Sequence, residues 1–399
     1  MATEDSGKFS PSESKDHSSD LGNSSPQVEA LISQLSQEEQ QDEKVFESQD
    51  LLFDELNTDK LRERETEYTD VEKHFVRSKA WLKVARELAP EVKAYYGRGL
   101  RYFTLPGFNR LDVGLLLRDG LLAVDPNDSD RVYVAGFEAD PSKFGRISGR
   151  FPKFKLLANS SVESALTDPK NRYYSELQSL FPFDIINLDL TTSLTPQHEG
   201  PYSTTMQAIN SVLRLQAGYP LPWALFLTFR NVASDWEQVA LGQLFENLQK
   251  NIGEYPAVRD AFYERHREHN VENLQKKDIK ACISQAVVKW LVDRAHSFNI
   301  RLKEYHCFEY CRRSAGLPPY TIFKQVLKFS QGGVSIAIVP MKATPRETWM
   351  QEDLVRCINS HKPLDVEERI LVASNSYPKF IEELQNDIKL LCSMGETKE

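Results

Sequence analysis

Polar residues that could do chemistry follow short apolar runs at several points in the middle of the chain. Glu138 comes directly after one run, and Asn159 and Ser160 come directly after the next. A third run carries Asn187 and Asp189 near its end, so in an extended strand these two side chains share one face. A carboxylate beside an amide can orient or deprotonate an amine, and carboxylates also accept hydrogen bonds from ligand hydroxyl groups.

These residues need regular elements to position them, and the sequence alternates apolar runs with amphipathic stretches from residue 99 onward. The runs predicted to form strands are 100–105, 132–137, 154–158, 184–190, 223–229, 301–310, 321–329 and 334–339. The stretches predicted to form helices are 110–122, 162–166, 173–180, 203–217, 236–252, 279–298 and 379–391. Short strands that are apolar on both faces and separated by helices predict an α/β fold with a doubly wound, mostly parallel sheet.

In an open α/β sheet, ligands bind outside the carboxyl ends of the strands. That rule gathers the polar residues after the second, third and fourth expected strands at one edge. The loop after the first expected strand, which contains Pro106 and Gly107, belongs to the same edge. We therefore expect any ligand site of this protein to lie between these loops.

This order of elements, with an acid directly after the second strand and an aspartate at the end of the fourth, resembles the class I S-adenosylmethionine-dependent methyltransferases, which have a Rossmann-like fold. The resemblance covers roughly residues 95–340, and the run 183–189 resembles the fourth-strand motif of tRNA guanine-N2 methyltransferases and of methyltransferase-like bacterial proteins. It implies S-adenosylmethionine as cofactor and a nucleic acid or a protein as methyl acceptor.

The resemblance also implies roles for individual residues. Glu138 matches the acid that holds the ribose hydroxyls, and Asn159 with Ser160 beside it matches the polar position that contacts adenine. The residues of the first loop, Pro106 and Gly107, match the loop that approaches the cofactor. The catalytic positions are Asp189 and Asn187 in the fourth strand, which face the methyl donor and the target atom.

Two departures from the family pattern support an alternative prediction. The first loop holds one glycine where the family has a glycine-rich loop, and residues 190–192 replace the family's proline–aromatic–glycine turn. The alternative is a catalytically inactive Rossmann-fold scaffold or regulatory subunit of a bacterial multi-protein complex, for example in antiviral genome defence. The polar residues then have structural explanations: Asp189 closes a turn, Glu138 is a solvated loop residue, and residues 159–161 cap a helix.

The charge of the chain is concentrated at its N-terminal end. The net charge is -9, and residues 1–60 hold 4 lysines and arginines against 15 aspartates and glutamates. Residues 1–26, acidic and rich in serine, are predicted to be disordered. Residues 27–96 form a predicted helical arm, with its best helix at 66–96, which Pro90 would interrupt or restart. The arm is either a solvated helix or a segment that docks a protein partner.

The arm is expected to precede a methyltransferase-like domain at 97–345 and a C-terminal helical extension at 346–399. Within the domain, the basic and aromatic residues of 259–280 could contact nucleic-acid phosphates, although the acids among them also fit a solvated helix face. The five cysteines are sparse and show no zinc-ligand spacing, which predicts reduced thiols, a cytoplasmic protein and no metal. No apolar run is long enough for a membrane span.

Overall fold

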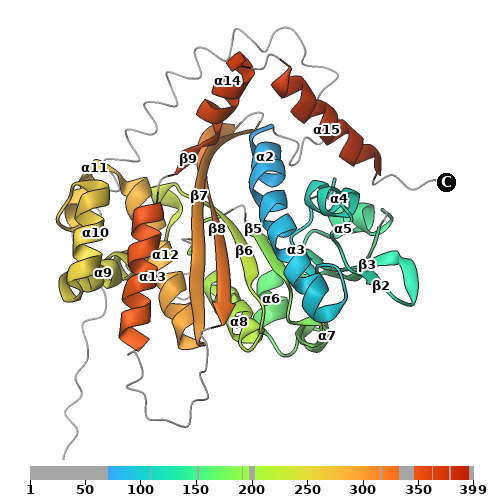
Figure 1. Ribbon diagram of the computed structural model, residues 1–399, viewed down its shortest axis with the longest axis horizontal. Coiled ribbons are helices and arrows are strands. Elements are labelled where there is room, and N and C mark those ends of the chain that lie inside the picture. Colours follow the sequence, from blue (N-terminus) through green and yellow to red (C-terminus); the bar gives the residue numbers. More distant parts are fainter. Residues whose placement is uncertain are drawn as a thin grey trace, which may run out of the picture.

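The computed structural model describes residues 71–107, 109–150, 152–190, 192–196, 203–314, 317–331, 346–361, 363–376 and 379–394. The predicted disordered segment 1–26, the first part of the arm and the expected strand 334–339 lie outside these residues. Figure 1 shows one central sheet that carries helices on both faces. The helices α9–α13 gather beside the β7–β8 end of that sheet, and α4 and α5 lie toward its other end.

The strands join into one mixed sheet in the order β4-β3-β1-β5-β6-β8-β7-β9, with the short β2 also paired to β3. Their bounds are β1 Tyr102–Thr104, β2 Val124–Asp125, β3 Asp128–Glu138, β4 Lys153–Asn159, β5 Ile185–Asp189, β6 Trp223–Arg230, β7 Ile300–Ser314, β8 Leu317–Gln331 and β9 Leu364–Asp365. The pairs β3–β4, β1–β3, β1–β5 and β5–β6 are parallel, whereas β8 is antiparallel to both β6 and β7. The predicted α/β class with a mostly parallel sheet is therefore confirmed.

The central strands β1, β5 and β6 are buried on both faces, which explains why they are almost continuously apolar in sequence. In β1, Tyr102 packs into the hydrophobic cluster on one face and Phe103 into the cluster on the other. In β5, Ile185 and Ile186 alternate in the same way. Two hydrophobic cores, one on each face, thus hold the sheet between helical layers.

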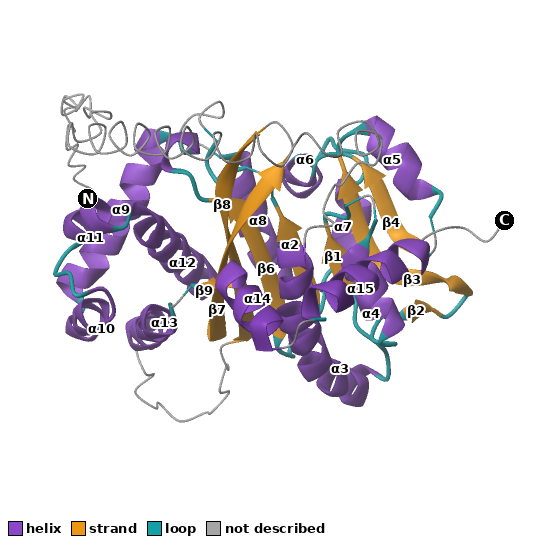
Figure 2. Ribbon diagram, turned by 90° about the horizontal axis from the view of Figure 1, so that it is seen from above, coloured by secondary structure: helices purple, strands orange, loops and turns teal. Residues whose placement is uncertain are grey.

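The two layers can be followed in Figure 2, where α3, α4, α14 and α15 lie along one side of the sheet. The opposite core contains residues of α6, α7, α8, α9 and α12. The helices are α2 Val71–Val76, α3 Leu82–Tyr96, α4 Leu111–Arg118, α5 Pro141–Ser148, α6 Val162–Thr167, α7 Tyr174–Leu180, α8 Thr204–Gln216, α9 Gln238–Glu254, α10 Pro256–His266, α11 Val271–Lys277, α12 Ile279–Ser297, α13 Arg346–Ser360, α14 Val366–Ser376 and α15 Phe380–Met394.

The N-terminal helical segment runs from α2 through a π-helical turn at Arg77–Trp81 into α3. The expectation that Pro90 interrupts this helix is wrong, because α3 continues past it to Tyr96 and ends at Gly97 in the left-handed conformation. The segment packs on the sheet through Trp81, whose ring stacks on Phe226 of β6 at 5.1 Å. This contact fixes the helical arm to the α/β domain.

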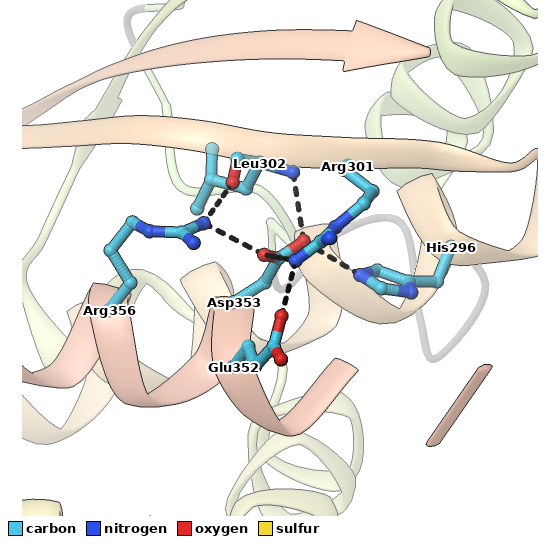
Figure 3. A network of polar contacts seen from close by, with 6 residues as sticks. All are labelled: His296, Arg301, Leu302, Glu352, Asp353 and Arg356. Atoms are coloured by element: carbon cyan, nitrogen blue, oxygen red, sulfur yellow. Dashed lines mark hydrogen bonds and ion pairs between the residues drawn. The ribbon is translucent and has the colours of Figure 1, made fainter. Parts of the chain in front are cut away.

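The C-terminal extension docks through a buried carboxylate on α13 (Figure 3). Asp353 is fully buried and accepts hydrogen bonds from His296 Nε2 at 2.9 Å, Arg301 at 3.0 Å, Arg356 at 2.8 Å and the Leu302 amide at 3.0 Å. Burial raises the pKa of Asp353, but the hydrogen bonds from His296 and Arg301 outweigh it and lower the pKa overall. The ionised carboxylate therefore ties α13 to α12 and β7.

The last two helices, α14 and α15, pack on the other face of the sheet. Asp387 of α15 lies 2.9 Å from His74 Nε2 on α2 and also pairs with Arg118 on α4. The sequence predicts α15 but gives no separate expectation for α13, α14, α5 or the β2–β3 hairpin. In the part of the chain that the structure describes, no helix combines the length and apolar character needed to cross a membrane.

Candidate functional site

A cavity of about 450 Å³ opens at the carboxyl ends of β1, β3, β4 and β5. It lies where the strand order reverses, because β1 pairs with β3 on one side and with β5 on the other. Ligands of open α/β sheets bind at such switch points. The lining residues are Leu105, Pro106, Gly107, Phe137, Glu138, Ala139, Lys143, Ser160, Ser161, Val162, Glu163, Asp189, Leu190, Thr192, Pro196, Thr204 and Thr205.

Glu138 lines the cavity from the last position of β3. One of its carboxylate oxygens accepts a hydrogen bond from the Asp140 amide at 2.9 Å, in a tight turn after the strand. Asp140 in turn caps α5, and hydrogen bonds from the Ser142 side chain and amide lower the pKa of Asp140. The turn thus holds Glu138 in place through one carboxylate oxygen. Among the described residues, none donates a hydrogen bond to the other oxygen.

Asn159 is paired in register with Glu138 but does not line the cavity. Its side-chain amide donates to the Glu138 carbonyl at 3.0 Å and to the Ala139 carbonyl at 3.4 Å, so it braces the neighbouring loop. Ser160 does line the cavity, and its hydroxyl accepts a hydrogen bond from Asn171 at 2.8 Å. Ser161 caps α6 by accepting from the Ser164 amide at 3.1 Å, which confirms a cap at the end of this stretch.

The cavity wall opposite β3 comes from α6 and from the start of α8. The hydroxyl of Ser203 caps α8 by accepting from the Met206 amide at 3.3 Å. Thr205 then donates a hydrogen bond to the Glu163 carboxylate at 3.3 Å, and both of these side chains line the cavity. Glu163 is therefore a second acid, besides Glu138, that lines the cavity.

Asp189 lines the cavity from the end of β5 and forms an ion pair with Lys73 of α2. The Lys73 ammonium and the Asp189 carboxylate are 2.6 Å apart, and the two side chains are 4% and 10% exposed. Taking charges out of water is costly unless they are paired, so each of these two groups stabilises the other in place. The helical arm consequently contributes a charged residue beside the cavity.

Asn187 lies beneath the cavity in a buried polar cluster. Asp112 of α4 accepts hydrogen bonds from Tyr102 Oη at 2.6 Å, Thr104 Oγ1 at 2.7 Å and Asn187 Nδ2 at 3.3 Å. Asn187 and Asp189 do share a face, as their spacing predicts, and both line a second cavity of only about 10 Å³. That space is too small for a cofactor. Asn187 does not line the main cavity, whereas Asp189 lines both cavities.

The structure thus gathers Pro106, Gly107, Glu138, Ser160 and Asp189 around one cavity and leaves Asn159 and Asn187 outside its lining. Sequence reasoning missed Lys143, Glu163, Thr205 and Lys73. The first two lie in the first turns of α5 and α6, directly after strand-edge loops, and that position was a usable signal. Lys73 gave no signal, since only the tertiary fold brings α2 to β5.

Three of the cysteines and His361 are buried in the part of the chain that the structure describes. Burial raises the pKa of the Cys307 thiol to about 12, and it raises the pKa values of Cys282 and Cys357 well above the usual range. Burial likewise lowers the pKa of His361 to about 3. Throughout the described ranges, no three His, Cys, Asp or Glu side chains lie close enough together to hold a metal ion.

Comparison with known proteins shows neither a family nor a function for this chain. A family model described as PP_RS20740-like matches residues 156–318. The structure resembles human methyltransferase-like protein 13 in complex with SAH, with 12% identity over 72% of this chain and 94% of that chain, at a TM-score of 0.25. No curated protein matches the sequence. The sheet order and the cavity therefore carry the functional argument.

Proposed function

We propose that this protein is an S-adenosylmethionine-dependent methyltransferase acting on a nucleic acid or a protein. The observation that carries the proposal is the cavity at the switch point of the sheet, with Glu138 at its edge. Its volume of about 450 Å³ lies within the usual range for small-molecule and cofactor sites. The topology and the acid after β3 are the features expected from the class I methyltransferase pattern.

The chemistry of the lining suits this cofactor. Three acids, Glu138, Glu163 and Asp189, line the cavity together with one cation, Lys143. A carboxylate can accept hydrogen bonds from both hydroxyls of a ribose, and the acidic lining favours the positive sulfonium and amino groups of S-adenosylmethionine. Lys143 offers a partner of the right sign for the carboxylate of the same ligand.

The residues of this chain have a modest chemical task. S-adenosylmethionine supplies an already activated methyl group, so the protein has to position the acceptor for in-line attack. In the proposal Glu138 holds the ribose, Ser160 contacts the base, and the loop at Pro106 and Gly107 closes over the cofactor. Asp189 orients the acceptor amine at the cavity edge, with Lys73 keeping its carboxylate in place.

Isothermal titration calorimetry of the full chain with S-adenosylmethionine and with SAH tests the proposal. We expect binding of both ligands, and we expect Glu138→Gln to weaken it about tenfold or more, since hydrogen bonds to charged groups contribute about 1.5–3 kcal/mol. The matched control is Glu246→Gln on α9, an exposed acid outside the cavity lining. Absence of binding at millimolar ligand would overturn the proposal.

A second candidate function is the catalytically inactive scaffold or regulatory subunit of a bacterial multi-protein complex. The observation that favours it is the Lys73–Asp189 ion pair. In this pair a residue of the arm binds the carboxylate that a methyltransferase would need for orienting the acceptor. Its partner would bind the arm at residues 27–96. If the protein is such a scaffold, calorimetry should show no heat of binding with either ligand. The purified full chain should then carry a protein partner, and deleting residues 1–70 should release that partner and leave the free chain.

A further inference from the structure

A second open groove, which we call the α8–α12 groove, has a volume of about 440 Å³ and carries positive charge. Its lining contains Arg214 of α8 and Arg294 of α12 and no acidic residue. Both arginines are exposed, and among the described residues neither forms an ion pair. The remaining lining residues are Leu166, Thr167, Tyr174, Met206, Gln207, Asn210, Ser211 and Trp290.

Helix geometry explains why these side chains converge. Gln207, Asn210, Ser211 and Arg214 recur at spacings of three and four, so they lie on one face of α8. Trp290 and Arg294 are four residues apart on α12 and therefore share one face of that helix. At 1.5 Å per residue, the lining of α8 from Met206 to Arg214 spans about 12 Å.

The groove combines three kinds of recognition group. The two guanidinium groups suit phosphates, to which arginine donates two hydrogen bonds at once. The half-buried rings of Trp290 and Tyr174 offer surfaces on which bases can stack. Gln207 and Asn210 carry amide groups that can both donate to and accept from base edges. Cations, aromatic rings and amides together are the equipment of single-strand binding surfaces.

We propose that the α8–α12 groove binds a single-stranded nucleic acid. The groove adjoins the cavity along α8, because Thr205 lines the cavity and Met206, the next residue, lines the groove. A strand in the groove would thus lead toward the cavity, which deepens the proposed function by naming its acceptor class. The binding itself needs no cofactor, so the two proposals can fail separately.

Residues 259–280 form a different basic surface and provide the matched control. Lys276 and Lys277 are exposed, but each is already paired with an acid: Lys276 lies 2.7 Å from Glu272 and Lys277 lies 3.0 Å from Glu268. Substituting cations that are already paired should change little the number of counterions that nucleic-acid binding releases. Substituting the groove arginines should reduce that number, because it removes charge that faces the ligand.

The experiment is fluorescence anisotropy of labelled single-stranded RNA and DNA 20-mers with the full chain at several salt concentrations, without cofactor. We expect the double variant Arg214→Ala/Arg294→Ala to weaken binding about tenfold or more and to reduce the slope of log K against log salt by about 1.4. We expect Trp290→Leu to weaken binding about fivefold or more through lost stacking. Both variants should retain the circular dichroism spectrum, and the arginine variant should also retain the melting temperature, whereas Trp290 packs partly against the core.

The double variant Lys276→Ala/Lys277→Ala should bind nearly as the unaltered protein does. Three results would overturn the proposal: no binding of either oligonucleotide at low salt, an equal loss in the lysine variant, or an unchanged affinity in the arginine variant. Binding of a phosphorylated peptide in the groove, with no oligonucleotide binding, would assign the site to a protein instead and would equally overturn it.

Discussion

Replacing Asp189 by asparagine should destabilise the fold substantially, because it removes the carboxylate charge that pairs with the buried Lys73 ammonium. The two groups lie 2.6 Å apart, and the Lys73 side chain is only 4% exposed. Removing one partner of a buried pair costs about 3–5 kcal/mol of unfolding free energy. Replacing both partners by neutral groups of similar size is often neutral, so the double variant Lys73→Met/Asp189→Asn should recover most of that loss.

Urea unfolding followed by tryptophan fluorescence measures these effects, since the chain has five tryptophans. Glu272→Gln provides the control, because the Lys276–Glu272 pair has a similar separation of 2.7 Å but its side chains are 57% and 54% exposed. Exposed helix pairs contribute about 0.3–0.5 kcal/mol. The reasoning is refuted if Asp189→Asn costs less than about 1 kcal/mol, or if the double variant is no more stable than the single one.

The same variants separate structural from chemical roles of Asp189. If its carboxylate only balances Lys73, the double variant should bind S-adenosylmethionine and methylate as well as the unaltered protein. If the carboxylate orients the acceptor, the double variant should be stable and bind the cofactor, yet transfer methyl groups more slowly.

Three further predictions concern stability. Burial lowers the pKa of His361 to about 3 and that of His266 to about 4, so the unfolded chain binds protons that the folded chain does not. Each of the two groups should cost about 2 kcal/mol of stability between pH 7.5 and 5. His361→Gln should therefore remove about half of their joint loss, whereas the exposed control His306→Gln should leave it unchanged. Asp353→Asn should cost about 1.5–3 kcal/mol in the same urea assay, because it removes the charge that accepts hydrogen bonds from the part-exposed Arg301 and the buried His296; a loss below about 1 kcal/mol would contradict the docking role. A Cβ at Gly99 would lie 2.6 Å from a neighbouring backbone carbonyl, so Gly99→Ala should lower the melting temperature, whereas Gly145→Ala in α5 meets nothing within 4 Å and should raise it.

Much of the architecture was readable because the strands and helices carry strong local patterns. The runs that form β1, β3, β4, β5 and β6 are short and apolar on both faces, and the rule that ligands bind beyond parallel strands then selects their carboxyl ends. The α/β class, the edge that holds the cavity and the placement of Glu138, Ser160 and Asp189 at it all follow from that pattern. Helix α13 lies within the predicted helical extension at 346–399, but no separate helix was assigned to it, and nothing local indicates that its Asp353 is a buried charge.

The sequence by itself determined which residues stand at the ends of the strands, because strand ends depend on local hydrophobic patterning. Only the tertiary structure decided what those residues face. Asn187 and Asp189 have the same orientation in the strand, yet one is enclosed by α4 and the other reaches the cavity. Lys73 meets Asp189 across more than a hundred residues. Such partnerships depend on how distant elements pack, and no local pattern encodes them.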